Sequence, residues 1–168
     1  MMAASVFFDT EFSNFAHPKL ISIGCVSCDG KEFYRELSDT YQPCDCSGFV
    51  LQTVLPLLGR GDAMMLEAQV ADRLKVWIES FEQEVVLMSD APSYDWPLVE
   101  YLFGFYGWPE NLRRKCGYVY FDRPEQQKRY ERALIGYWAL HAARQHHALV
   151  DARSLQFAAR LAVRRGEA

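Results

Sequence analysis

The chain has 168 residues, of which 50% are hydrophobic and 24% are charged, and its formal net charge is −4. This size and composition suit one folded domain with a hydrophobic core and argue against bulk disorder. No apolar segment approaches the roughly 20 residues that are needed to span a membrane. The N-terminus also lacks the basic region of a secretory signal peptide, so none is expected. We therefore expect a cytoplasmic protein without a membrane anchor.

The first third of the chain predicts a β-meander. Apolar and alternating patterns indicate three strands, over residues 4–9, 19–27 and 32–37. Asp29-Gly30 is a hairpin signal between the second and third strands. Residues 38–62 are irregular, although a short helix over 47–55 fits the pattern.

The remainder alternates helices and strands. Leu66, Val70 and Leu74 begin an apolar stripe with helical spacing, which predicts a long helix over about 63–81. The elements expected after it are a strand over 84–89, a helix from near Asp95, a strand over 117–121, and helices over about 125–144 and 151–164. This order predicts an α/β fold in which a mixed five-stranded sheet is flanked by helices, with a single domain over residues 1–168.

Two carboxylates end the first strand. Asp9 and Glu11 are two residues apart, so a strand points both side chains to one face, next to apolar Phe7. Adjacent carboxylates repel each other and lose hydration, so a positive partner is expected between them. Oxygen ligands of this kind favour a hard divalent cation.

A third acid opens the helix after the fourth strand. Asp95 fits a simple N-cap followed by Pro97, but it also lies on the apolar stripe of that helix and should face the sheet. Asp90, in the preceding loop, is the competing acid.

The last polar cluster is His146-His147 followed by Asp151. Asp151 begins the apolar stripe of the final predicted helix, where a role as a helix-dipole partner is the alternative to a functional one. A histidine beside a carboxylate–metal centre can act as a general base, because its pKa lies near neutrality.

The five cysteines are a separate signal. Their odd number, without an export signal, argues against a disulfide framework. Cys25, Cys28, Cys44 and Cys46 would supply four zinc thiolates, whereas ordinary half-buried thiols are the simpler interpretation.

Three of these motifs together resemble the DEDDh branch of the DnaQ-like 3′–5′ exonucleases. Asp9 and Glu11 match its Asp-x-Glu motif, Asp95 matches its second aspartate, and His146 with Asp151 matches His-x-x-x-x-Asp. The sequence Phe-Asp-Thr-Glu-Phe and the short length of the chain make it most similar to small bacterial exoribonucleases of the RNase AS type. The resemblance implies an RNase H-like fold with a mixed five-stranded sheet.

The resemblance also implies a mechanism. Two Mg²⁺ or Mn²⁺ ions would be held by Asp9, Glu11, Asp95 and Asp151, with Asp9 bridging them. His146 would take the proton of the attacking water. The expected activity is a 3′–5′ exoribonuclease that releases nucleoside 5′-monophosphates from single-stranded RNA 3′ ends.

Substrate contacts carried over from the resemblance are less specific. Phe12 would stack on the terminal base, unless it belongs to the core, and backbone amides near Thr10 and Phe12 would contact the terminal 3′-OH. Tyr94, Trp96 and Phe15 are further stacking candidates. His147 is a neighbouring substrate contact, and Arg153 is a candidate phosphate contact.

The partners and alternatives follow from the same resemblance. Many small members of the family are homodimers, so a homodimer is expected by analogy. The same chemistry on single-stranded DNA, in repair or proofreading, is the first alternative. A non-catalytic nucleic-acid-binding module on the same fold is the second.

Overall fold

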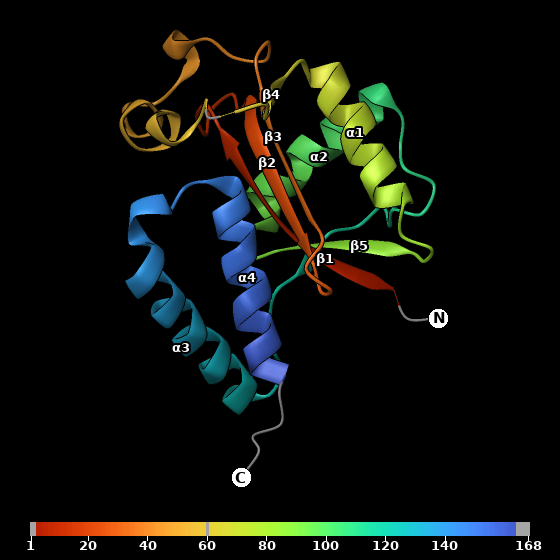
Figure 1. Ribbon diagram of the computed structural model, residues 1–168, viewed down its shortest axis with the longest axis vertical. Coiled ribbons are helices and arrows are strands. Elements are labelled where there is room, and N and C mark those ends of the chain that lie inside the picture. Colours follow the sequence, from red (N-terminus) through yellow and green to blue (C-terminus); the bar gives the residue numbers. More distant parts are fainter. Residues whose placement is uncertain (1–2, 60, 164–168) are drawn as a thin grey trace.

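The computed structural model describes residues 3–59 and 61–163. Within them, a mixed six-stranded sheet with the strand order β4-β3-β2-β1-β5-β6 forms the middle layer (Figure 1). Strands β1, β2 and β3 form the predicted antiparallel meander, and β5 pairs with β1 in parallel. The strands are β1 (Ala4–Phe12), β2 (Leu20–Ser27), β3 (Glu32–Leu37), β4 (Met64–Met65), β5 (Val85–Ser89) and β6 (Gly117–Tyr118).

Helices cover both faces of the sheet. Alternation along β1 sends Val6 and Phe8 into the core beneath α1 and α2, and Phe7 into a second cluster beneath α3 and α4. The α-helices in the described residues are α1 (Glu67–Glu79), α2 (Pro92–Tyr106), α3 (Pro124–His141) and α4 (Ala148–Val163). None of these helices is long and apolar enough to cross a lipid bilayer.

A short irregular segment follows β3. It contains η1 (Pro43–Asp45), the π-helical turn η2 (Val50–Val54) and η3 (Leu55–Leu57). Val50 and Val54 bury their side chains against Ile21 of β2, which fixes the segment at one end of the sheet. In Figure 1 this segment, the C-terminal end of β1 and the N-terminal end of α4 lie at the same end of the molecule.

The predicted fold class is confirmed, with differences at the sheet edges. The sheet has a sixth strand because Met64–Met65, predicted as the start of a helix, pairs in parallel with Glu36–Leu37. The strand predicted over 117–121 ends at Tyr118, because its partner β5 ends at Ser89, the residue that pairs with Tyr118. Residue 164, the end of the last predicted helix, lies outside the described residues.

Candidate active site

The Asp9–Glu11 pair lies on the sheet face that α4 covers. Both residues follow Phe7 at two-residue spacing along β1, and Asp9 stands opposite Gly24 of β2. The register of the β1–β2 pair shifts between Glu11 and Phe12, so the strand is irregular directly after the acidic pair. Glu11 is buried, and Asp9 is partly buried.

Asp95 reaches the same site from the opposite layer. Helix α2 begins at Pro92, so Asp95 lies in its first turn rather than at its N-cap. Its Oδ1 accepts the Thr10 N–H at 3.2 Å and the Thr10 hydroxyl at 2.6 Å, while its Oδ2 accepts the Ser89 hydroxyl. Thr10 points to the face opposite Asp9 and Glu11, and it therefore ties β1 to α2.

The start of α4 supplies the last two residues. The His146 N–H donates to Asp151 Oδ2 at 3.1 Å. His146 has φ 68°, the only positive φ at a non-glycine residue in the described chain. That conformation is uncommon for a side chain with a Cβ atom, and it turns the chain into α4. Gly24 lets this turn approach the sheet, because a Cβ there would lie 2.3 Å from the Leu149 nitrogen.

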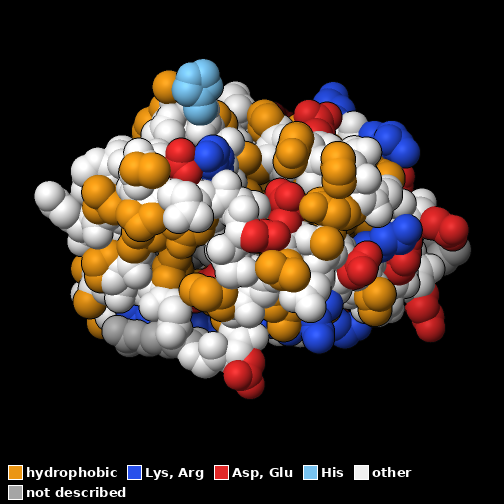
Figure 2. Space-filling view, turned by 90° about the horizontal axis from the view of Figure 1, so that it is seen from above, with side chains coloured by type: hydrophobic (Ala, Val, Ile, Leu, Met, Phe, Trp, Pro, Cys, Tyr) orange, Lys and Arg blue, Asp and Glu red, His pale blue; other side chains and the backbone are white. Residues whose placement is uncertain are grey.

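These side chains converge on one pocket of about 540 Å³. The nearest potential ligand atoms of Glu11, His146 and Asp151 all lie within 4.8 Å of one another. Figure 2 views this end of the molecule, with acidic side chains near its middle and hydrophobic ones spread over the side where η1–η3 lie. The pocket is lined by Asp9, Thr10, Glu11, Phe12, Asn14, Phe15, Ser47, Phe49, Val50, Ala91, Tyr94, Asp95, His146 and Asp151.

Burial, and then mutual repulsion, raises the pKa of the four carboxylates. Burial, followed by the charges of Asp151 and Asp95, raises the pKa of Glu11 to about 8. Burial raises the pKa of Asp151 to about 7, and that of Asp95 to about 6 against the opposing hydrogen bonds from Ser89 and Thr10. Burial, followed by the charges of Asp95, Glu11 and Asp151, holds the pKa of Asp9 well above its usual range. The site therefore gains from a bound cation.

The donor set fits a hard divalent cation. Asp151 Oδ1 is buried and has no hydrogen-bond partner among the described residues. Neither Lys nor Arg occurs among the described residues that line the pocket. Within residues 3–59 and 61–163, no Lys or Arg forms an ion pair with any of the four carboxylates, and their oxygens are the ligands that Mg²⁺ and Mn²⁺ favour.

An aromatic wall forms the open side of the pocket. The rings of Phe12 and Phe15 lie 5.2 Å apart, those of Phe15 and Tyr94 also 5.2 Å, and those of Phe12 and Tyr94 6.4 Å. Phe15 is 75% exposed and Tyr94 is 55% exposed. Phe12 itself is partly buried against the core, whereas the exposed rings of Phe15 and Tyr94 offer flat surfaces to a planar ligand.

Three predicted substrate contacts lie outside the pocket lining. Trp96 is buried against Trp108, and His147 is buried with its ring 4.5 Å from that of Tyr34. Arg153 forms a two-contact ion pair with Glu32, at 2.7 Å and 2.6 Å. Thr10 lines the pocket, but its N–H and hydroxyl both donate to Asp95.

Sequence reasoning missed the contribution of the irregular segment after β3. Ser47, Phe49 and Val50 line the pocket, although no motif marks them. The only available signal was an aromatic residue beside the apolar positions of the short helix expected over 47–55.

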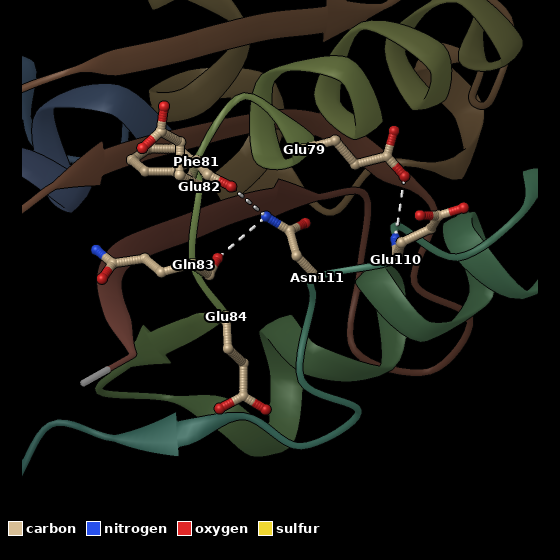
Figure 3. A pocket seen from close by; sticks show the side chains of 7 residues that line it. All are labelled: Glu79, Phe81, Glu82, Gln83, Glu84, Glu110 and Asn111. Atoms are coloured by element: carbon tan, nitrogen blue, oxygen red, sulfur yellow. Dashed lines mark hydrogen bonds between the residues drawn. The ribbon is translucent and has the colours of Figure 1, made fainter. Parts of the chain in front are cut away.

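A second acid-rich hollow has a structural explanation (Figure 3). The Asn111 amide donates to the carbonyl groups of Ile78, Phe81 and Gln83 at 2.9–3.2 Å, which ties the end of α1 to the approach to β5. Two of the four acids among its described residues have partners, since Glu79 accepts the Glu110 N–H at 3.0 Å and Glu84 pairs with Arg113. The other two, Glu82 and Glu110, are exposed to solvent, so this hollow lacks the buried carboxylates of the first pocket.

The cysteines do not form a metal site. Cys25 is buried, Cys28 and Cys44 are exposed, and Cys46 is partly exposed. Over residues 3–59 and 61–163, the only close group of three or more potential metal ligands is that of Glu11, His146 and Asp151. The zinc interpretation of the four cysteines therefore has no structural basis.

Comparison with solved structures identifies the fold. No protein-family model and no curated protein sequence matches the chain. A structure of exonuclease I superposes with a TM-score of 0.56 at 14% identity, over 92% of this chain and 39% of that one. The predicted RNase H-like fold is confirmed.

Two further structures of the same enzyme agree. E. coli exonuclease I in complex with a dT13 oligonucleotide gives a TM-score of 0.54 at 14% identity, over 92% of this chain and 40% of that one. The metal-free E. coli exonuclease I–ssDNA complex gives 0.55 at 16% identity, over 95% and 39%. This chain spans about two fifths of the length of exonuclease I, and at these identities the likeness concerns the fold.

Proposed function

We propose that this protein is a metal-dependent 3′–5′ exonuclease of the DEDDh type that releases nucleoside 5′-monophosphates from single-stranded RNA. One observation carries the proposal. Three motifs that are far apart in the sequence place Asp9, Glu11, Asp95, Asp151 and His146 around a single pocket. Acids gathered at the end of a buried strand have a large electrostatic cost, which a phosphodiesterase metal centre would offset.

The carboxylates would hold two divalent ions, Mg²⁺ or Mn²⁺. When bound, such ions neutralise charge on the phosphate and lower the pKa of water. The pocket supports this requirement, because the described residues that line it include no cationic Lys or Arg that could neutralise a phosphate. Exonuclease activity should therefore be lost completely in EDTA.

The protein's own groups would orient the substrate and accept the proton. Burial lowers the pKa of His146, which favours the neutral imidazole that can accept a proton from the attacking water. The hydrogen bonds from Thr10 and Ser89 fix the Asp95 carboxylate before substrate binds. The exposed rings of Phe15 and Tyr94 would stack on unpaired bases.

RNA is the preferred substrate in this proposal, on the strength of the resemblance of Phe-Asp-Thr-Glu-Phe and the His146–Asp151 motif to small exoribonucleases. Single-stranded DNA is the second candidate, since the exonuclease I structures contain a dT13 oligonucleotide or ssDNA. A 2′-OH contact distinguishes the two substrates.

Matched 3′- and 5′-labelled RNA and DNA oligomers, incubated with Mg²⁺, Mn²⁺ or EDTA, test the proposal directly. Stepwise shortening of RNA from its 3′ end supports it, and faster DNA shortening selects the second candidate. Tight binding without cleavage would favour a non-catalytic binding module. Asp151→Asn is the matched control, because it keeps the size of the side chain and removes its charge.

A cytoplasmic homodimer completes the proposal by analogy with the small exoribonucleases. Sedimentation equilibrium of the purified protein tests the dimer. A monomer across the micromolar range would remove the dimer from the proposal without affecting the chemistry of the pocket.

A further inference from the structure

Phe49 is an exposed aromatic residue that contacts the candidate catalytic base. The centroid of its ring lies 4.9 Å from that of the His146 imidazole, and the two planes meet at 89°. This edge-to-face arrangement is one that aromatic rings prefer. Yet Phe49 is 53% exposed, so burial in the core does not explain its position.

Other residues anchor the segment that carries this ring. Val50 and Val54 are buried against Ile21, and the Ser47 N–H donates to the Ser13 carbonyl at 2.9 Å. At the far end of the segment, the Gly59 N–H donates to the buried carboxylate of Glu36 at 2.7 Å. These contacts hold the segment in place without Phe49, so the Phe49 ring is not needed to anchor it.

The backbone of His146 is held firmly, but its side chain is not. The His146 N–H bonds to Asp151, and the adjacent His147 ring stacks on Tyr34 at 4.5 Å. No hydrogen bond to the His146 imidazole occurs within the described part of the chain. The edge-to-face contact with Phe49 therefore limits the rotation of the imidazole about its side-chain bonds.

We propose that Phe49 is a positioning residue whose ring keeps the His146 imidazole turned toward Glu11 and Asp151. A general base works only within hydrogen-bond reach of the proton that it accepts, so an imidazole that rotates freely spends time out of position. The inference rests on the proposed function for the role of His146, but the ring contact exists without substrate.

Nuclear magnetic resonance of the metal-free protein tests the contact without relying on activity. Phe49→Leu should shift the His146 imidazole proton resonances, because the ring current of the neighbouring aromatic is lost, and Phe49→Tyr should preserve them. Phe15→Ala is the matched control, since Phe15 is exposed in the same pocket but contacts Phe12 and Tyr94. Unchanged His146 resonances in Phe49→Leu would overturn the proposal.

Kinetics on a labelled oligomer distinguish positioning from base stacking. Phe49→Leu should lower kcat about 10-fold at constant KM, which is part of the roughly 10²–10⁴-fold that a general base contributes, and Phe49→Tyr should restore it. Phe15→Ala should instead raise KM. A Phe49→Leu variant with raised KM and unchanged kcat would make Phe49 a base platform and refute the positioning role.

The two proposals fail in different ways. A wild-type protein that cleaves no oligomer refutes the exonuclease function, while the resonance experiment still decides whether Phe49 orients the imidazole. If Phe49→Leu lowers the thermal midpoint, Phe49→Met replaces it, because an unbranched side chain of similar size fills the same space without a ring.

Discussion

Gly24→Ala is the substitution that most directly tests how the site is assembled. Gly24 stands opposite Asp9 in the sheet, and the first turn of α4 packs on it. A Cβ at this position would lie 2.3 Å from the Leu149 nitrogen and 2.4 Å from the carbonyl carbon of Ala148. These are backbone atoms, so no side-chain rotation relieves the clash. Restoring ordinary contact moves the start of α4 outward by about 1 Å.

That movement displaces Asp151 and His146 from the pair on β1. A misplacement of about 1 Å in a catalytic constellation costs on the order of 10²-fold, so we expect kcat to fall by about that factor. Overpacking of this kind also lowers the free energy of unfolding by about 1–3 kcal/mol. Single-turnover cleavage of a labelled oligomer and urea denaturation measure the two effects.

Gly104→Ala is the matched control. Gly104 lies in α2, and no atom lies within 4 Å of the Cβ that alanine would add. Alanine there should raise the free energy of unfolding by about 0.5–1 kcal/mol and leave kcat unchanged. A Gly24→Ala protein with wild-type kcat and stability would refute the close approach of α4 to the sheet.

Three further outcomes are expected. Asp95→Asn should reduce turnover about 10–100-fold, whereas Asp90→Asn should not, because Asp90 is absent from the pocket lining. The reverse result would assign the second aspartate of the motif to Asp90 instead of Asp95. The thermal midpoint of the metal-free protein should fall as pH rises from about 5 to about 8, because Glu11 and Asp151, with pKa values of about 8 and about 7, keep protons that the unfolded chain has lost. Scanning fluorimetry with Mg²⁺ or EDTA should show the largest stabilisation by metal at the upper end of this range, and a flat profile would contradict the pKa assignment. Arg153→Ala should change the free energy of unfolding by less than about 1 kcal/mol, because its ion pair with Glu32 is partly exposed. KM should stay constant, because Arg153 is absent from the pocket lining, and a raised KM would identify a phosphate contact.

Local sequence patterns were sufficient to predict the order of strands and helices and the direction of the main acidic side chains. Strand periodicity placed Asp9 and Glu11 on one face, and helical periodicity turned Asp95 and Asp151 inward. Both inferences use only the geometry of a single element. The order of strands and helices then brings those elements to one end of the sheet.

Contacts between distant residues were beyond such reasoning. Arg153 forms an ion pair with Glu32, which lies 121 residues away in the sequence, and no local pattern predicts that pair. His147 was separated from His146 only by motif spacing, whereas the structure buries it on Tyr34. Phe49 lies within the short helix expected over 47–55, but the pattern of that segment does not predict that its ring contacts His146.

The acids of the pocket also differ in when they are synthesised. Asp9 and Glu11 are made first and Asp95 follows, while Asp151 comes last and enters with α4. Because domains emerge from the ribosome N-terminus first, a nascent chain that has passed Asp95 still lacks the histidine and the final carboxylate. A chain interrupted before residue 151 would carry an incomplete centre. Under the proposed function, the docking of α4 would therefore be the step that completes the metal centre.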